Sequence, residues 1–444
     1  MKKVTIVGAG LVGSLQAVYM AKRGWQVEVF ERRPDLRKAE IDAGRSINLV
    51  VARHGWKSLE EAGIADEIRK LTIPVYGRMI HDEKGDTNFQ PYSVKGKAIH
   101  SVSRSGLNAK LMDCAEQYQN VKFHFSERCS DVDLNNATAI FENSETGKQT
   151  NISADLIIGA DGAYSEVRHR MMMTDRFNYS QQYIEHGYKE IHFPPNDDGT
   201  PKMQQDALHI WPRKNYMLMG LSNLDGGFTG TLFFPFESDG WSFGSIKTEN
   251  DVTRFFEEVF PDAIPLIPNF AEQYFANPTS SLVIVRCYPW TYKNVMLIGD
   301  AAHAIVPFYG EGMNCGFEDC FVFDQLMDEF DEDLNRVLPE YGKSRKPNGD
   351  AIADLSMRNF IEMRDLVADP QFVLRKKIEA KIYAQYPEKW IPLYSQVKFT
   401  DIPYSEALKE GQRQDEIMKK ILRKDGIMEN WDSEDVEREI LEMI

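Results

Sequence analysis

The segment Val4-Thr-Ile-Val7-Gly8-Ala-Gly10-Leu-Val-Gly13 decides the fold of this chain of 444 residues. It starts with a run of β-branched residues that is typical of a strand, and it continues through three glycines into a helical pattern that reaches Arg23. A second strand pattern, Gln26 to Phe30, follows and leads into Glu31. Strand, glycine turn, helix and strand form a βαβ unit, which predicts a parallel sheet.

The glycine spacing is that of a dinucleotide-binding turn. Gly8 permits the tight turn, Gly10 lets the backbone approach a pyrophosphate, and Gly13 lets the helix pack closely on the strand. The helix N-terminus faces the phosphates, and Glu31 is placed to bind ribose hydroxyls, which favours FAD or NAD over a 2′-phosphorylated nucleotide. A chance glycine turn is the weaker alternative, and we interpret Arg32-Arg33 as a solvated turn.

Two later segments repeat the first half of this unit. Ala154 to Gly159 leads into Asp161-Gly162, and Asn294 to Gly299 leads into Asp300. Ligands of such sheets lie at the carboxyl ends of the strands, so Asp300 is placed to bind a ribityl hydroxyl. The glycine-rich run 310–314 then opens a helix whose positive end would stabilise a reduced flavin, although an ordinary strand-turn-helix connection is the alternative.

The rest of the chain changes pattern twice. Short aromatic and aliphatic strands separated by turn residues fill 189–236, which indicates an antiparallel sheet, and helical spacing begins near Glu311. We therefore predict an α/β fold with a Rossmann-like FAD-binding domain, an inserted antiparallel β-sheet substrate domain and a C-terminal helical region. The expected boundaries are 1–70, 100–180 and 285–340 for the FAD-binding domain, 71–99 and 181–284 for the sheet domain, and 341–444 for the helices.

Composition excludes several classes of protein. Lys and Arg total 52 against 68 Asp and Glu, and a net charge of −16 disfavours nucleic acid as a partner. Five cysteines without a Cys-x-x-Cys pair argue against a disulfide framework and a zinc site, and the nine histidines show no ligand spacing, so we expect no metal. Without a signal peptide or 18 consecutive apolar residues, we expect a soluble cytoplasmic protein.

These motifs resemble those of the class A flavoprotein monooxygenases, the single-component aromatic hydroxylases. The resemblance rests on the three glycines with Glu31, on Asp161-Gly162, and on Gly299-Asp300-Ala-Ala-His303 with Pro307. It implies tightly bound FAD, a hydride taken from NADPH as co-substrate without a second Rossmann domain, and O2 transferred to an activated ring through a flavin C4a-hydroperoxide. No second Gly-x-Gly-x-x-Gly is present in the sequence, which agrees with this.

Finer segments are similar to the branch of that family that converts L-kynurenine to 3-hydroxykynurenine in tryptophan catabolism and NAD biosynthesis. They are 44–49, 76–81, 90–92, 208–212, 306–308 with 312–314, and 359–363. The resemblance implies that Arg78 and Tyr92, helped by Asn359, hold the substrate carboxylate. It also implies that further side chains surround the substrate: Glu362, Met363, Tyr394, Leu208, Met217, Leu221, Thr231 and Phe233.

Other roles follow from the same resemblance. No side chain is expected to act as an obligatory base, and Pro307, Phe308 and Tyr309 are expected to position the reactants. The ring amino group of kynurenine already activates its ortho position, so orientation and a dry site are what the protein supplies. The expected FAD-binding residues are Gly8, Gly10, Gly13, Glu31, Arg104, Asp161, Asp300, Gly312, Met313 and Asn314.

The residue types suit these roles, although each also has an ordinary explanation. A guanidinium binds both oxygens of a carboxylate, yet an arginine such as Arg78 in isolation is more often a surface ion pair. Asn359, Glu362 and Met363 share one face of a helix, as they would in any amphipathic helix.

The chain departs from the family pattern at two positions. Glu311 stands where the family usually has glutamine, and Tyr309 replaces a Phe or His. A carboxylate close to the flavin would disfavour the reduced anion unless it points away or is protonated. The membrane anchor of eukaryotic relatives is not found at the C-terminus, which implies a bacterial-type enzyme.

Two other functions stay open. The chain could be another flavin hydroxylase acting on a phenol, or a flavin-binding redox sensor without turnover. A halogenase is discounted because the sequence has no Trp-x-Trp-x-Ile-Pro segment.

Overall fold

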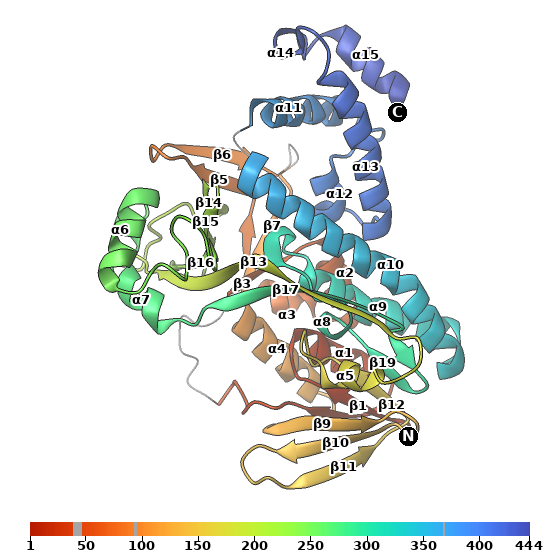
Figure 1. The fold of residues 1–444 in the computed structure, drawn as a ribbon. Coiled ribbons are helices and arrows are strands. Elements are labelled where there is room, and N and C mark those ends of the chain that lie inside the picture. Colours follow the sequence, from red (N-terminus) through yellow and green to blue (C-terminus); the bar gives the residue numbers. More distant parts are fainter. Residues whose placement is uncertain (39–46, 93–95, 367–368) are drawn as a thin grey trace.

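The computed structural model describes residues 1–38, 47–92, 96–366 and 369–444. In Figure 1 the N-terminal strands lie at the bottom, a larger sheet lies in the middle, and the last helices lie at the top. The long helix α10 (Leu334–Ile361) crosses the molecule diagonally between these regions.

The first sheet contains the predicted βαβ unit. Its strand order is β18-β19-β12-β1-β2-β8, and its pairs are parallel except β18 with β19. The strands are β1 (Lys3–Val7), β2 (Gln26–Phe30), β8 (Val121–His124), β12 (Leu156–Gly159), β18 (Thr291–Tyr292) and β19 (Val295–Leu297). The two predicted repeats of the first strand, β12 and β19, therefore lie side by side next to β1.

Helix α1 (Leu11–Lys22) is buried almost throughout, because other helices cover the side that faces away from the sheet. Its neighbours include α4 (Arg104–Glu116), α9 (Gly312–Glu329) and α2 (Arg53–Ala62). Short helices complete this region: α3 (Ala65–Arg69), α5 (Glu166–Met171) and α8 (Asp300–His303).

The second large sheet is the predicted antiparallel one. Its order is β17-β13-β16-β15-β14-β5-β6, with β14 and β5 parallel. The strands are β5 (Gly77–His81), β6 (Thr87–Pro91), β13 (Asn178–Phe193), β14 (Ala207–Arg213), β15 (Tyr216–Ser222), β16 (Phe228–Pro235) and β17 (Ser280–Tyr288). Strands from both predicted segments, 71–99 and 181–284, share this sheet, while the domain boundaries stay predictions.

Successive side chains along each strand point to opposite sides of the sheet, so this sheet has two different faces. One face, with Leu218, Leu232 and Phe234, packs against α6 (Glu249–Val259) and α7 (Phe270–Ala276), which follow in the chain together with the turn η1 (Ile264–Leu266). The opposite face, with Leu208 and Phe233, packs against the turn η2 (Pro307–Tyr309) and the end of α10. This second face forms one wall of the site described below.

Two three-stranded sheets flank the large ones. One is formed by β9 (Glu127–Asp133), β10 (Thr138–Asn143) and β11 (Gln149–Ser153), and the other by β3 (Asn48–Val51), β7 (Ile99–Ser103) and β4 (Ile73–Val75). The mixed α/β architecture thus confirms the predicted fold class.

The C-terminal region is helical, as predicted. After α10 come a π-helical turn η3 (Glu362–Leu366), α11 (Pro370–Gln385), α12 (Leu393–Phe399), α13 (Tyr404–Ile421), α14 (Ile427–Asn430) and α15 (Glu434–Met443). Val436 and Ile440 of α15 are buried against α11 and α13, so the acidic tail ends in a packed helix. Among the described residues, no helix combines the length and apolar composition needed to cross a bilayer.

The first glycine turn offers a test of local strain. Gly8 has φ +102°, and a Cβ there would lie 2.6 Å from the carbonyl oxygen of Ala160, whereas a Cβ at Gly10 would meet nothing within 4 Å. We expect Gly8→Ala to lower the free energy of unfolding by about 1–3 kcal/mol. The matched control Gly10→Ala, compared in the FAD-free proteins because Gly10 lines the cavity, is expected to cost less, about 0.5–1 kcal/mol, since it changes only the N-cap of α1. Urea unfolding of both variants checks this, and equal losses would contradict it.

Candidate active site

One long cavity of about 670 Å³ runs from the β1–α1 turn to the seven-stranded sheet. Its volume falls within the range of pockets that bind cofactors and other small molecules, roughly 300–1,000 Å³. Most of the predicted site residues line it: Gly8, Gly10, Glu31, Arg78, Arg104, Asp161, Leu208, Leu221, Thr231, Phe233, Asp300, Pro307, Phe308, Tyr309, Gly312, Met313, Met363 and Tyr394.

The end of the cavity at the β1–α1 turn has the features of a dinucleotide cradle. Backbone without side chains faces it at Gly8 and Gly10, while Gly13 lies behind them, where a Cβ would overlap the carbonyl oxygen of Gly8. The Glu31 carboxylate accepts hydrogen bonds from the backbone N–H of Ala9 at 3.0 Å and from Arg33 Nε at 2.7 Å. The acid is thereby fixed at the edge of the cavity, beside an arginine that stays largely exposed.

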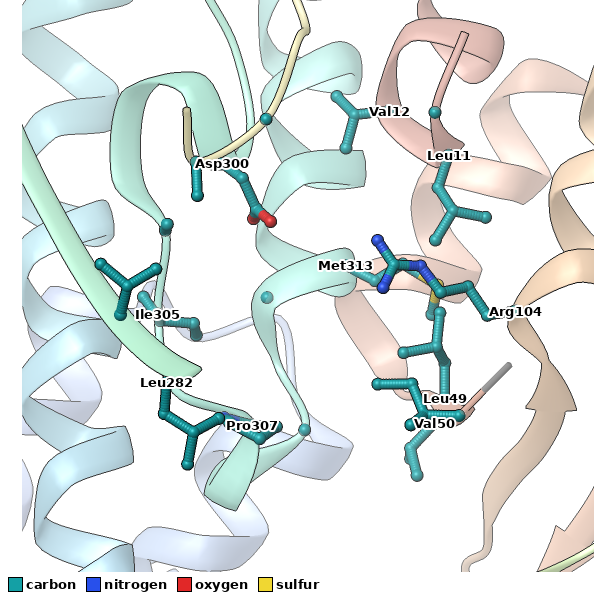
Figure 2. Close-up of a pocket in the computed structure, with 18 of the residues that line it drawn as sticks. Leu11, Val12, Leu49, Val50, Arg104, Leu282, Asp300, Ile305, Pro307 and Met313 are labelled. Atoms are coloured by element: carbon teal, nitrogen blue, oxygen red, sulfur yellow. The ribbon is translucent and has the colours of Figure 1, made fainter. Parts of the chain in front are cut away.

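The middle of the cavity is formed where three elements begin. Figure 2 shows Asp300 from α8 and Arg104 from α4 reaching toward the cavity from different sides, with Met313 of α9 between them. Asp161 accepts a hydrogen bond from the backbone N–H of Glu166 at 2.7 Å through Oδ2, and its buried Oδ1 has no partner among the described residues. Burial raises the pKa of Asp161 above its ordinary value. A glycine cradle, helix N-termini and a free carboxylate oxygen fit an FAD molecule along this path.

Asn314 does not line the cavity. Its side chain accepts a hydrogen bond from the backbone N–H of Ala52 at 2.9 Å and donates to the carbonyl oxygens of Val50 and Gly310 at 2.9 and 3.0 Å. The amide therefore ties α2 and β3 to the start of α9. Direct contact of this side chain with FAD stays a prediction, and these hydrogen bonds do not support it.

The far end of the cavity carries a cation among aromatic rings. The guanidinium carbon of Arg78 lies 4.7 Å from the ring centre of Tyr394 and 5.7 Å from that of Tyr92, and the two rings stack 5.3 Å apart. Arg78 Nε and Tyr92 Oη are buried without a hydrogen-bond partner, and no carboxylate in the described part of the chain forms an ion pair with Arg78. Two unused donors beside an uncompensated positive charge are what a bound carboxylate would satisfy.

Apolar side chains separate this cation from the cradle. Leu208, Leu221, Phe233 and Met363 belong to one buried cluster and also line the cavity. Met217 belongs to the same cluster without lining the cavity, so it backs the wall. Such a wall excludes water from the space between the two polar ends.

Three further predicted substrate residues do not line the cavity: Tyr92, Asn359 and Glu362. Asn359 donates to the carbonyl oxygen of Phe308 at 2.6 Å, which fastens the turn η2 to α10. Glu362 accepts from Arg358 Nε at 2.9 Å, and Arg358 is also paired with Asp415 of α13. Asn359 Nδ2 lies 3.3 Å from Met363 Sδ, so these two side chains share one side of the helix. The place of Glu362 beside the substrate stays a prediction.

Lys398 lines the cavity and was not predicted. It lies four residues after Tyr394 on α12, and residues at this spacing lie on the same side of a helix. The spacing from Tyr394 could therefore have indicated Lys398 as a site residue. Its ammonium nitrogen is 2.5 Å from Glu311 Oε1, while Tyr404 donates to Oε2 at 2.7 Å. Glu311 does not line the cavity, so the carboxylate that departs from the family pattern points away from it.

A buried chain of charges lies beneath the cavity. Asp319 accepts from Arg345 Nε at 2.7 Å and contacts His303 Nε2 at 2.5 Å, and Glu318 lies 2.7 Å from Arg345 and 2.8 Å from His54. His303, Cys315 and Asp319 lie close enough to hold a metal ion, but the guanidinium of Arg345 already pairs with this carboxylate. The chain joins α2, α8, α9 and α10, and Asp319 also accepts a hydrogen bond at 3.1 Å from the backbone N–H of Gly299, which immediately precedes α8.

Glu318 makes this network sensitive to acid. Burial opposes its ionisation, but Arg345 and His54 outweigh that effect and lower the pKa of Glu318 from 4.5 to about 2. The ionised group therefore stabilises the fold above pH 4.5, and its contribution is lost as pH falls from 4.5 toward 2. A shift of this size corresponds to about 3 kcal/mol.

We expect Glu318→Gln to lower the free energy of unfolding at pH 7, and the deficit relative to the parent to shrink between pH 4.5 and pH 3. Urea unfolding at each pH measures it. Glu416→Gln, at an exposed carboxylate, is the control and should give a small difference throughout. A deficit for Glu318→Gln that does not change with pH would contradict the assignment.

Comparison with known proteins agrees with this geometry. The model of the family described as FAD binding domain matches residues 1–356. The chain is 49% identical to a kynurenine 3-monooxygenase of Flavobacterium psychrophilum, over 100% of this chain and 98% of the relative. It is 50% identical to one of Christiangramia forsetii, over 100% and 99%. A solved structure of a tetrameric 2-methyl-3-hydroxypyridine-5-carboxylic acid oxygenase has a TM-score of 0.68 at 20% identity, covering 88% of this chain and 98% of that one, which shows the fold alone.

Proposed function

The chain belongs to the FAD-binding family and, within it, to the kynurenine 3-monooxygenases, and on this premise we propose that it hydroxylates L-kynurenine at the ring 3-position. NADPH and O2 are the co-substrates, and 3-hydroxykynurenine is the product. The observation that carries the proposal is the far end of the cavity, where Arg78 lines the wall with its buried Nε unpaired, beside apolar side chains and next to the unpaired hydroxyl of Tyr92, which itself lies outside the lining. L-kynurenine has both a carboxylate and an aromatic ring.

FAD is proposed to occupy the cradle end. Gly8, Gly10 and the N-terminus of α1 would face its pyrophosphate, Glu31 its adenosine ribose, and Asp300 its ribityl chain. Arg104, Asp161, Gly312 and Met313 would complete the site, with Gly13 and Asn314 acting from behind it. When bound, FAD supplies the chemistry of hydride acceptance and oxygen activation.

The side chains orient the substrate and keep the reaction dry. Arg78 is proposed to bind the carboxylate through its planar fork, and Tyr92 to donate a further hydrogen bond. The ring would then lie along Leu208, Leu221, Thr231 and Phe233, with Met363 and Tyr394 beside it and Met217 behind. The turn η2 would set the distance between ring and cofactor, because Asn359 holds its Phe308 carbonyl. No base is needed, since the ring amino group already activates its ortho carbon.

We also propose a cytoplasmic location. All five cysteines are free and buried thiols in the structure, which suits a reducing compartment.

The proposal is tested by adding L-kynurenine, NADPH and air to the FAD-loaded protein. We expect rapid NADPH oxidation and a product one oxygen atom heavier, with 4-hydroxybenzoate giving no such product. Hydroxylation of 4-hydroxybenzoate alone would favour a phenol hydroxylase, and bound yellow flavin without turnover on either compound would favour a redox sensor.

Arg78→Ala tests the carboxylate contact. Loss of a charged hydrogen-bonding partner costs about 2–3 kcal/mol, so we expect the KM for L-kynurenine to rise about 30- to 150-fold while FAD affinity stays the same. Tyr92→Phe should give a smaller rise of about fivefold. Arg254→Ala, at an exposed arginine of α6, serves as the control. An unchanged KM in Arg78→Ala would show that the carboxylate binds elsewhere.

A further inference from the structure

The Glu311–Lys398 ion pair connects two parts of the chain that are 87 residues apart in sequence. Glu311 immediately precedes α9, whose N-terminus faces the cavity, and Lys398 lies in the last turn of α12. Both side chains are buried, at 0% and 2% exposure, so neither charge has solvent as an alternative partner. The pair is therefore a fixed connection between the C-terminal helices and the loop expected to face the flavin.

The surroundings of the pair hold it in one geometry. Tyr404, the first residue of α13, donates to the second oxygen of Glu311 at 2.7 Å. Burial, followed by the nearby carboxylate of Glu311, raises the pKa of Tyr404 well above its ordinary value, so its hydroxyl stays a donor. Lys398 Nζ also lies 3.5 Å from the carbonyl oxygen of Gly310 and 5.8 Å from the ring centre of Tyr309. The ammonium group thus contacts the loop in three ways: through the Glu311 carboxylate, the Gly310 carbonyl and the Tyr309 ring.

The same helix carries a residue of the proposed carboxylate site. Tyr394 precedes Lys398 by four residues on α12, and both line the cavity. The ring of Tyr394 lies over the guanidinium of Arg78 at 4.7 Å and stacks on Tyr309 at 5.6 Å. A displacement of α12 would therefore move the Tyr394 ring, and with it both the contact with Arg78 and the contact with Tyr309 of η2.

We propose that Lys398 is a positioning residue: its buried ion pair with Glu311 acts as a latch that holds α12, and with it Tyr394, against the flavin-facing loop 307–312. The inference rests on the proposed function and deepens it, since it gives the C-terminal helices a role in the reaction. It also explains the unusual acid, because Glu311 is the group to which Lys398 is bound. With the latch broken, substrate binds more weakly, and more of the NADPH consumed yields hydrogen peroxide in place of hydroxylated product.

A purely stabilising role makes a different prediction, and a pair of variants separates the two. Lys398→Met keeps the long apolar stem but leaves the buried Glu311 carboxylate without its cation, which is strongly unfavourable. The double variant Glu311→Gln with Lys398→Met removes the latch without leaving an unpaired charge. If Lys398 serves only to neutralise the buried carboxylate of Glu311, the double variant should behave as the parent protein does.

The experiment measures the thermal midpoint, the KM for L-kynurenine and the hydroxylated product formed per NADPH in the FAD-loaded parent and variants. We expect Lys398→Met to lower the midpoint, raise the KM at least fivefold and lower the product per NADPH at least threefold. The double variant should recover the midpoint but keep both catalytic defects. Lys57→Met, which removes a lysine that is 35% exposed and lies 3.8 Å from Asp401, is the matched control and should change none of these values.

Hydrogen exchange of a peptide spanning 393–399 gives a readout that needs no turnover. Faster exchange than in the parent, in both Lys398→Met and the double variant, is the expected result. Recovery of the KM and of the product per NADPH in the double variant would refute the proposed latch. Unchanged hydrogen exchange of the 393–399 peptide in the variants would also refute it. If the parent forms no hydroxylated kynurenine, the proposed function fails, and the exchange result alone then decides whether the latch exists.

Discussion

The packing around Val12, at the start of α1, is the constraint on which the site depends. A Cβ at Gly316 of α9 would lie 2.6 Å from a Val12 methyl group, and a Cβ at Gly299 would lie 3.0 Å from one. Only glycines at these positions let the segment that follows β19 lie directly on the first turn of α1. This close approach brings Asp300 and the N-terminus of α9 beside the glycine turn of β1. Residues almost 300 positions apart in sequence thereby form one cradle.

The cavity uses opposite physical properties at its two ends. The cradle offers backbone N–H groups and helix N-termini, which are suited to phosphates, beside the carboxylates of Glu31 and Asp161. At the far end, Arg78 keeps its charge within a group of aromatic rings, at a cost that a bound carboxylate would offset. The apolar face of the seven-stranded sheet lies between them and would keep the reacting atoms away from water. On the proposed function, the specificity of the site depends on distance, since substrate and cofactor would be anchored at their polar ends and would meet in the middle.

Local patterns in the sequence were sufficient to predict the elements that carry the cradle. The run Val4–Val7, the three glycines and Glu31 form the strand, turn and acid that the spacing predicted, because those features are dictated by backbone geometry. Features that depend on tertiary contacts were not predictable in the same way. Arg358, the partner of Glu362, is also paired with Asp415 of α13, and the side chain of Asn314 is hydrogen-bonded to the backbone of Val50, Ala52 and Gly310. Glu311 looked unfavourable until its distant partner Lys398 was placed beside it. The identity of Glu311 alone does not show that Lys398, 87 residues later, becomes its partner in the folded protein.

A crystal structure of the protein with FAD and L-kynurenine bound would show where the substrate carboxylate lies. We expect the carboxylate to lie within hydrogen-bond distance of Arg78 Nε and Tyr92 Oη, with the ring against Phe233 and Leu208 and the isoalloxazine beside η2. A carboxylate bound away from Arg78, or FAD lying outside the cradle at Gly8 and Gly10, would contradict this expectation.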